Sequence, residues 1–247
     1  MLERDSEDRV IRQTVPLSRV RQTIAERLTH GMQHYPQGTG MVVVDAGALV
    51  RFRQELKERG VSISFGDLFV KAAANALTRV PELNASRGES EIVYYRSVNI
   101  GMMADINGNL MAPVISETQS KTVEQVAVEL RQTYDYLKRG KLMRVKLDGA
   151  TFSISNLGMF PMDGFTPLLS PPQGGILGVG RIRRVPGFND AGNVVPRDEV
   201  TLSITTDHGL VDGIHVAKFL QALIEAISDP WHSMYKTGAE DAAPANP

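Results

Sequence analysis

The most constraining stretch of this sequence is a short polar loop between a strand and a helix, late in the chain. It reads DHGLVDG at residues 207–213. Before it, residues 200–205 alternate apolar and polar side chains, which is typical of a half-buried strand. After it, residues 214–228 carry apolar side chains at helical spacing. The sequence therefore predicts that His208 lies in a short loop braced by two rigid elements.

A histidine held in this way can act as a general base that removes a proton from a thiol or a hydroxyl, for roughly 10²–10⁴-fold in rate. Asp212 and Gly213 are expected to fix the loop, because a carboxylate can anchor a cation and glycine accepts unusual backbone angles. The stretch offers no covalent nucleophile, so a deprotonated substrate would attack directly and an oxyanion donor would come from elsewhere. The alternative is that His208 only caps or packs.

Composition narrows the function classes. Hydrophobic residues make up 42% and charged residues 22% of the 247 residues, the ordinary globular range. The balance of 27 basic and 28 acidic residues argues against nucleic acid and anionic membranes as partners. The absence of cysteine excludes disulfides, thiolate metal sites and a cysteine nucleophile, and it fits a cytoplasmic location. No apolar run approaches the about 20 residues of a membrane-spanning helix, and residues 1–8 lack the apolar core of a signal peptide.

Periodicity and capping residues predict the remaining elements. Helices are expected over 18–31, 48–59, 64–77 and 122–140, with Ser18, Asp45, Ser64 and Thr122 as caps. Strands are expected at 41–44, 91–95, 98–104, 110–115, 151–155, 174–182 and 200–205, with a tight turn at 107–109. Residues 35–40 and 158–172 read as irregular, and 186–196 as an exposed hairpin. Residues 1–13 are expected to form a flexible arm, 14–235 one domain and 236–247 a disordered tail, and the mixed order predicts an α/β sandwich with a mixed sheet.

Five blocks of the sequence occur in the order of one enzyme family. They are RQTIAERL at 21–28, NLMAPVI at 109–115, TFSISNLG at 151–158, PPQGGILGVG at 171–180 and DHGLVDG at 207–213. Together they resemble the catalytic domain of the dihydrolipoyl acyltransferases of 2-oxo-acid dehydrogenase complexes, which are relatives of chloramphenicol acetyltransferase. The resemblance covers residues 14–230. It implies a trimeric, two-layer chloramphenicol acetyltransferase-like sandwich that moves an acyl group between a dihydrolipoyl thiol and coenzyme A.

The resemblance also implies roles for three residues. His208 would deprotonate the attacking thiol, and Asp212 would orient the loop. Ser155 would stabilise the tetrahedral oxyanion, a contribution of about 10²–10³ in rate for one donor. Ser153 shares a strand face with Ser155, but only Ser155 matches the family's position. In the family, histidine and serine come from different subunits of a homotrimer; coenzyme A is a substrate, and no metal is involved.

Three features depart from the family pattern. The arginine that usually follows the motif histidine is Gly209, which removes a donor and is expected to loosen the loop. Gly174 and Gly175 replace the usual pair of small residues, which predicts more room or a softer strand. Residues 229–235 replace an apolar C-terminal anchor, which predicts a trimer without a larger shell. No lipoyl domain precedes the catalytic blocks, so either this is an excised core or the lipoyl group is supplied in trans by a lipoyl-bearing partner.

Two other functions stay open at this point. One is an acyl-CoA-dependent acyltransferase with an amine, a hydroxyl or a carrier-bound thiol as acceptor. The other is a non-catalytic trimeric scaffold. Metal binding is not expected, because His215 and His232 have no carboxylate or histidine at ligand spacing. The glycines at 175, 178 and 180 are in the wrong order for a phosphate loop, and no helix follows them.

Overall fold

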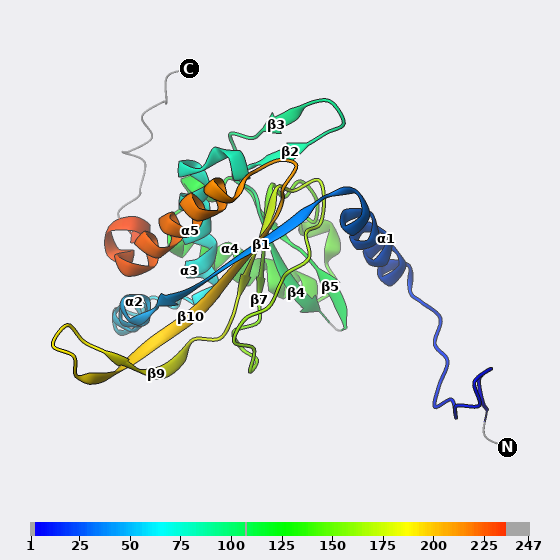
Figure 1. The fold of residues 1–247 in the computed structure, drawn as a ribbon, viewed down its shortest axis with the longest axis horizontal. Helices are drawn as coiled ribbons and strands as arrows, with labels where there is room; N and C mark the ends of the chain where they lie inside the picture. The colour runs from blue at the N-terminus through cyan, green and yellow to red at the C-terminus, as the bar shows by residue number, and fades with distance from the viewer. Residues whose placement is uncertain (1–2, 107, 236–247) are drawn as a thin grey trace.

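A mixed β-sheet covered by helices organises the protein in this computed structural model, which describes residues 3–106 and 108–235 (Figure 1). The helices are α1 (Arg19–His34), α2 (Gly47–Glu58), α3 (Phe65–Arg79), α4 (Val123–Lys138), α5 (Gly213–Ser228) and the π-helical turn η4 (Trp231–Tyr235). The strands are β1 (Gln37–Asp45), β2 (Ala85–Arg87), β3 (Ile92–Tyr94), β4 (Ile100–Ile106), β5 (Asn109–Met111), β6 (Val114–Ile115), β7 (Phe152–Asn156), β8 (Gly175–Val179), β9 (Arg183–Phe188) and β10 (Val194–Asp207). The predicted α/β class is confirmed.

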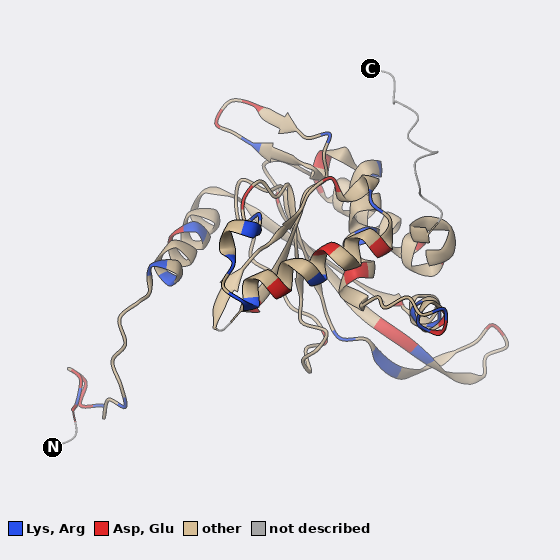
Figure 2. Ribbon diagram, turned by 180° about the vertical axis from the view of Figure 1, so that it is seen from behind, with Lys and Arg blue, Asp and Glu red and all other residues tan. Residues whose placement is uncertain are grey.

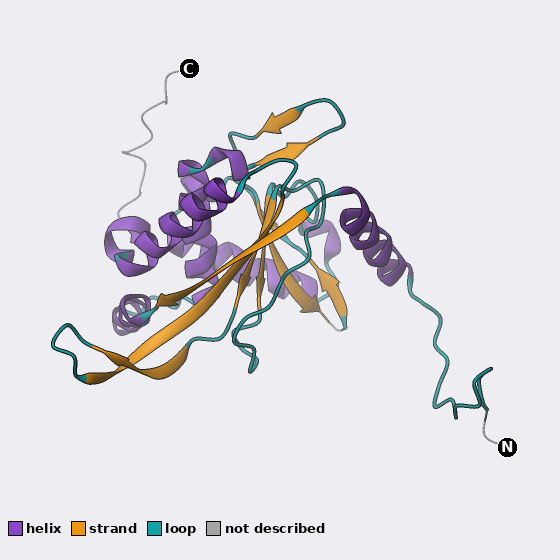
Figure 3. Ribbon diagram, in the orientation of Figure 1, coloured by secondary structure: helices purple, strands orange, loops and turns teal. Residues whose placement is uncertain are grey.

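The sheet is mixed, as predicted. Its main order is β1-β10-β8-β7-β4-β5, with β6 paired to β4 and β9 paired to β10. Strands β4, β7 and β8 run parallel, and the other pairs are antiparallel. Helices α2, α3 and α5 lie together on one side of β1 and β10, whereas α1 lies apart from them (Figure 3).

The two faces of β7 have different surroundings. Phe152 is fully buried, and its ring centroid lies 5.4 Å from that of Phe219 on α5. Because side chains alternate along a strand, Ser153 and Ser155 point to the opposite face. Gly178 of β8 pairs with Ser155, and a Cβ atom at Gly178 would lie 3.2 Å from ring atoms of Phe165 and Pro167. The irregular segment 157–174 therefore covers part of the Ser155 face.

Capping residues begin the helices much as the sequence predicts. Ser64 and Asp67 form a capping box at α3, and the Ser64 N–H donates to Asp67 Oδ2 at 2.7 Å. Ser18 and Thr122 cap α1 and α4. Asp45 is not the cap of α2, although its Oδ1 accepts the Gly47 N–H at 2.8 Å. That contact starts α2 one residue earlier than expected.

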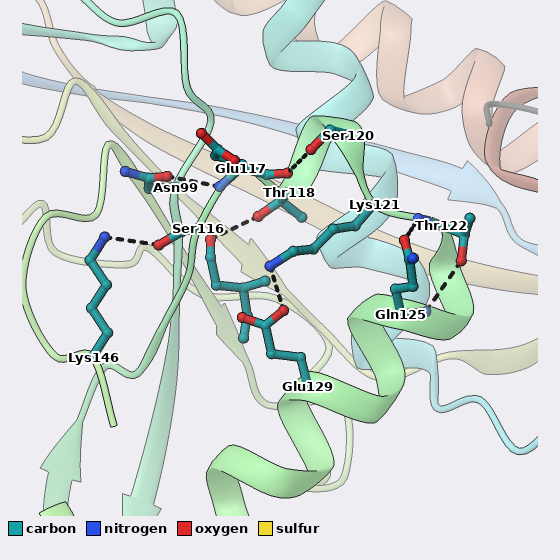
Figure 4. A network of polar contacts seen from close by, with 11 residues as sticks. Asn99, Ser116, Glu117, Thr118, Ser120, Lys121, Thr122, Gln125, Glu129 and Lys146 are labelled. Atoms are coloured by element: carbon teal, nitrogen blue, oxygen red, sulfur yellow. Dashed lines mark hydrogen bonds and ion pairs between the residues drawn. The ribbon is translucent and has the colours of Figure 1, made fainter. Parts of the chain in front are cut away.

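A network of polar contacts shapes the turn between β6 and α4 (Figure 4). Glu117 has a left-handed backbone with φ of +48°, and its N–H donates to Asn99 Oδ1 at 2.9 Å. The Ser120 hydroxyl donates to the Glu117 carbonyl at 2.8 Å. Lys121 pairs with Glu129 of α4. These contacts hold the turn in a backbone conformation that a non-glycine residue seldom adopts.

Residues 37–40 were expected in a loop, and this prediction is wrong, because β1 begins at Gln37. Glycines weaken a strand by themselves, but tertiary contacts decide here. A Cβ atom at Gly40 would lie 2.9 Å from Val216 Cγ1, so α5 packs too closely on the strand for a larger residue. Thr39 pairs with Thr205 of β10, and their hydroxyl oxygens lie 2.9 Å apart.

The hairpin predicted at 186–196 is confirmed, but it is longer than expected because β10 runs unbroken from Val194 to the motif. The β9–β10 hairpin projects from the body of the protein (Figure 1). Pro186 and Pro196 lie opposite each other in it. Proline has no N–H to donate to a neighbouring strand. Both prolines lie in the part of the hairpin that extends past the end of β1, where β10 has no described partner on its β1 side.

The strand predicted at 110–115 is divided into β5 and β6. Proline cannot donate to a strand partner, and Pro113 stands at the break, where its carbonyl accepts the Met102 N–H at 2.9 Å. Strand β2, which pairs with β3, was not predicted. Its three residues are too few for a periodic pattern to be recognised.

The ends of the chain leave some predictions open. Residues 236–247, predicted as a disordered tail, and Asn107 of the predicted turn lie outside the described residues. Gly108 has φ of +79°, as a turn requires. Within 3–106 and 108–235, none of the helices combines the length and the apolar character that crossing a membrane would need. Both basic and acidic residues lie along α4 and along the β9–β10 hairpin (Figure 2).

Candidate active site

His208 stands immediately after β10, where the structure anchors its backbone and leaves its side chain open. The His208 N–H donates to the Pro36 carbonyl at 2.7 Å. The side chain is 58% exposed. A Cβ atom at Gly38 would lie 3.4 Å from His208 Cδ2, so β1 borders one side of the ring. The predicted presentation of a histidine between a strand and a helix is confirmed.

Asp207 is the buried neighbour of this histidine. Only 1% of it is exposed, and its carboxylate is paired with Arg87 of β2. Arg87 Nε donates to Asp207 Oδ2 at 2.6 Å, and Arg87 Nη2 donates to Asp207 Oδ1 at 3.3 Å. The hydrogen bond to Asp207 raises the pKa of Arg87. The Gly209 N–H completes the set by donating to Asp207 Oδ1 at 2.9 Å.

Asp212 lies at the other end of the loop, as the N-cap of α5. Its side chain is 76% exposed, and its Oδ1 lies 4.0 Å from His208 Nδ1. The Asp212 N–H donates to His215 Nδ1 at 3.2 Å. The carboxylate that holds an arginine in this loop is therefore Asp207, although Asp212 was expected to anchor a cation. A role for Asp212 in orienting the loop stays a prediction.

Ser155 and Ser153 lie on the same face of β7 but in different environments. Ser153 is buried, and its hydroxyl donates to Gln173 Oε1 at 2.5 Å. Ser155 is half-buried, and no described side chain hydrogen-bonds its hydroxyl. Of the two, Ser155 therefore has the hydroxyl available to a ligand.

One chain does not bring Ser155 and His208 together. Ser155 pairs with Gly178, and Gly178 pairs with Ser203 of β10. His208 comes five residues after Ser203, so it lies roughly 17 Å further along the strand direction and about 10 Å across from Ser155. A single substrate carbonyl cannot contact both side chains of the same chain.

A cavity of about 500 Å³ lies on the Ser153 side of the sheet. Its walls come from α1, β4, the start of β7 and the irregular segment, and include Ile24, Leu28, Met103, Ser153 and Gln173. Neither His208 nor Ser155 lines it. Within the described ranges, no group of three or more acidic or histidine side chains could hold a metal ion.

Comparison with known proteins identifies the family. Residues 10–235 match the model of the 2-oxoacid dehydrogenases acyltransferase catalytic domain. The chain belongs to this family. A succinyltransferase component of the 2-oxoglutarate dehydrogenase complex of Pseudomonas aeruginosa is 33% identical over 226 residues, covering 89% of this chain and 55% of that protein. The chain spans about half the length of the curated relatives it matches.

Solved acyltransferase structures agree with the fold. A probable dihydrolipoamide acetyltransferase from Listeria monocytogenes superposes with a TM-score of 0.83 at 30% identity, covering 92% of this chain and 97% of that chain. Chloramphenicol acetyltransferase superposes with a TM-score of 0.54 at 18% identity, covering 87% of this chain and 99% of that chain, which shows the fold alone. The predicted chloramphenicol acetyltransferase-like sandwich is confirmed.

The departures from the acyltransferase pattern look different in the structure. Gly209 does not remove the anchor of the loop, because Arg87 supplies a guanidinium from β2. Gly174 and Gly175 do not leave room: a Cβ atom at Gly174 would lie 2.8 Å from the Ala85 carbonyl oxygen, and one at Gly175 would lie 2.7 Å from the Phe152 ring. The expectations of a loosened loop and of more room are wrong, and the softer strand stays a prediction.

Sequence reasoning missed Arg87 and the role of Asp207. A carboxylate at the end of a buried strand needs a partner, and this was the available signal. That partner, Arg87, lies 120 residues earlier in the chain, and it could not be predicted because strand β2, which carries it, was not predicted.

Proposed function

We propose that this protein transfers acyl groups between a dihydrolipoyl thiol and coenzyme A. The observation that carries the proposal is His208, exposed at the end of β10 with its backbone fixed on both sides, in a chain of the acyltransferase family. The acetyltransferase and succinyltransferase names of its relatives support acyl transfer and leave the acyl chain open.

His208 acts as the base in the proposed reaction. Its imidazole takes the proton of the attacking thiol, and the thiolate adds to the thioester carbonyl. The Ser155 hydroxyl donates to the oxygen that becomes negative in the tetrahedral intermediate. When this intermediate collapses, the bond to the leaving sulfur breaks and that sulfur receives the proton from His208.

The proposed site forms between two copies of the chain. Ser155 and His208 of one chain are too far apart to act on one carbonyl, so the second copy supplies the missing group. We propose a homotrimer, in agreement with the family resemblance. The lipoyl group comes from a lipoyl-bearing partner, and coenzyme A acts as a substrate.

Contacts of η4 support a trimer without a larger shell. Trp231 Nε1 donates to Glu55 Oε2 at 3.0 Å, and the Arg59 guanidinium lies 4.5 Å from the Trp231 ring centroid. Asn75 Nδ2 donates to the Ser233 carbonyl at 2.6 Å. These contacts hold η4 against α2 and α3 of its own chain. Sedimentation equilibrium should give the mass of three chains, and a mass of many trimers would contradict the proposal.

The activity is tested by incubating the purified protein with acetyl-CoA or succinyl-CoA and dihydrolipoamide. Formation of S-acyl-dihydrolipoamide and free coenzyme A is the expected result. The same acyl-CoA offered to amines, hydroxyl compounds and carrier-bound thiols tests the alternative acceptors. No transfer to any acceptor would contradict the proposed function and leave the scaffold as the better account.

A further inference from the structure

The Arg87 guanidinium joins several parts of the chain around the His208 loop. Besides its two hydrogen bonds to Asp207, Nη2 donates to the His34 carbonyl at 3.3 Å. The guanidinium carbon lies 4.7 Å from the centroid of the Tyr35 ring, within the range of a cation–π contact. One side chain therefore links β2, the end of α1 and the end of β10.

Asp207 depends on this partner because it is buried. A buried carboxylate is costly unless it is paired and hydrogen-bonded. Paired with Arg87, its Oδ1 also accepts the Gly209 N–H, while the His208 N–H donates to Pro36. The backbone on both sides of the His208 side chain is thus fixed, and the Gly209 side of it depends on Arg87.

Gly209 leaves the space that Arg87 occupies. A Cβ atom at Gly209 would lie 2.9 Å from Arg87 Nε, 3.2 Å from Arg87 Cζ and 3.2 Å from Asp207 Oδ1. Its φ angle is outside the left-handed region, so the backbone would accept another residue. Glycine is needed at position 209 because it has no side chain to displace Arg87, and not because of its backbone freedom.

We propose that Arg87 is a positioning residue for His208 and that Gly209 is its matched counterpart. Arg87 holds the Asp207 carboxylate, the carboxylate holds the Gly209 amide, and the loop holds the imidazole at the angle that deprotonation of a thiol requires. A side chain at position 209 displaces Arg87 and breaks this chain of contacts. The inference rests on the proposed acyltransferase function and names the residues that prepare its base.

A double-mutant cycle tests the pair. Arg87→Ala should lower kcat by about 10- to 100-fold, the scale expected for a misplaced catalytic group, with KM for both thiol substrates unchanged. Arg87→Lys should not restore kcat, because an ammonium cannot make the paired hydrogen bonds and the ring contact together. Gly209→Ala should lower kcat by a similar factor. The double variant should lose no more kcat than Arg87→Ala alone, because the Arg87 side chain that a methyl group at position 209 would displace is already absent.

Hydrogen exchange gives a readout that does not need activity. The Gly209 amide, which donates to Asp207, should exchange faster in each single variant. In the double variant it should exchange no faster than in Arg87→Ala, while the amides of buried α3 keep wild-type protection. Arg96→Ala is the matched control, since Arg96 is exposed and follows β3 in the same part of the chain.

The inference would be overturned by losses in kcat that multiply in the double variant, or by unchanged exchange of the Gly209 amide in Arg87→Ala. A rise in KM at constant kcat would also overturn it and make Arg87 a binding residue. If the wild-type protein transfers no acyl group, the proposed function fails, whereas the exchange data still decide whether Arg87 and Gly209 hold the loop.

Discussion

At the scale of single residues, the loop places an exposed histidine beside a buried carboxylate. The His208 side chain is exposed because it follows the end of β10. Asp207 is buried because it is still the last residue of that strand. A general base must be accessible to the proton donor. A buried carboxylate instead needs a paired cation to offset the loss of its hydration. Adjacent residues therefore serve different purposes, and the end of a strand separates them.

Replacement of His208 by alanine should lower kcat for acyl transfer by about 10²–10⁴-fold, because the attacking thiol loses its general base. Steady-state kinetics with acyl-CoA and dihydrolipoamide measure the effect. His232→Ala, on the exposed side of η4, serves as the control and should keep wild-type rates. Equal activity of His208→Ala and wild type would remove His208 from the mechanism.

Lys71 of α3 is a second residue whose environment sets its chemistry. It is fully buried, and its Nζ donates to the Gln119 carbonyl at 3.0 Å. Burial disfavours the charged ammonium and lowers the pKa of Lys71 from 10.5 to about 8. Since the folded pKa is the lower one, the unfolded chain binds more protons between these values, and the free energy of unfolding rises with pH there.

Relative to Lys71→Met, the wild-type free energy of unfolding should gain about 3 kcal/mol between pH 7.5 and pH 10.5. Urea denaturation of both proteins at the two pH values measures the difference. Lys218→Met, at an exposed position of α5, should keep the wild-type gain. A parallel pH dependence of Lys71→Met and wild type would show that the lysine is not held in a low-dielectric site.

At the scale of elements, close approach of backbones explains the glycines before β8. Gly174 lies against the carbonyl oxygens of Leu83 and Ala85, and Gly175 lies against the Phe152 ring. The Asp207 N–H also donates to the Gly174 carbonyl at 3.3 Å. The start of β8 is thus packed between the segment leading into β2 and the end of β10, and it helps to place the motif.

Gly174→Ala should destabilise the fold by about 1–3 kcal/mol, because the added methyl group meets backbone oxygens that cannot rotate away. Chemical denaturation measures the change. Gly213→Ala is the matched control: apart from its chain neighbours and the backbone of its own helix, no described atom lies within 4 Å of the added Cβ, and α5 begins there. The control should be neutral or more stable by up to about 1 kcal/mol. Equal stabilities of the two variants would contradict the close packing.

At the scale of the whole molecule, the proposed site is incomplete in one chain. The register of β7, β8 and β10 places Ser155 and His208 far apart. Helix α1 gives the same indication, since Gly31 is its single buried residue and Val20 and Met32 remain exposed. A helix with an apolar stripe is expected to bury it, and a second copy of the chain can cover it.

Complementation tests the shared site. His208→Ala and Ser155→Ala should each be strongly impaired alone. Co-expressed in equal amounts, they should form mixed trimers in which about a quarter of the sites combine an intact histidine with an intact serine from another chain. Activity of the mixture near a quarter of wild type is the expected result. Activity no higher than the mean of the two variants would place both groups in one chain.

Much of the fold could be predicted, because local signals and tertiary structure agree for most elements. Ser64 and Thr122 begin their helices as expected, and the alternation around Ser155 marks a real strand. The failures share a cause. The extent of β1, the length of β10 and the existence of β2 depend on partner strands that are distant in the sequence.

The sequence by itself determined the α/β class, the family, and the placement of His208 between a strand and a helix. These follow from periodicity, capping and contiguous motifs, which act over a few residues. Only the tertiary structure decided what holds that histidine. Arg87 reaches Asp207 across 120 positions, and Gly209 matters because of what fills the space beside it. The backbone of the DHGLVDG loop is held in place because Arg87 of β2 pairs with the buried Asp207 carboxylate. These two residues come together only when the chain has folded.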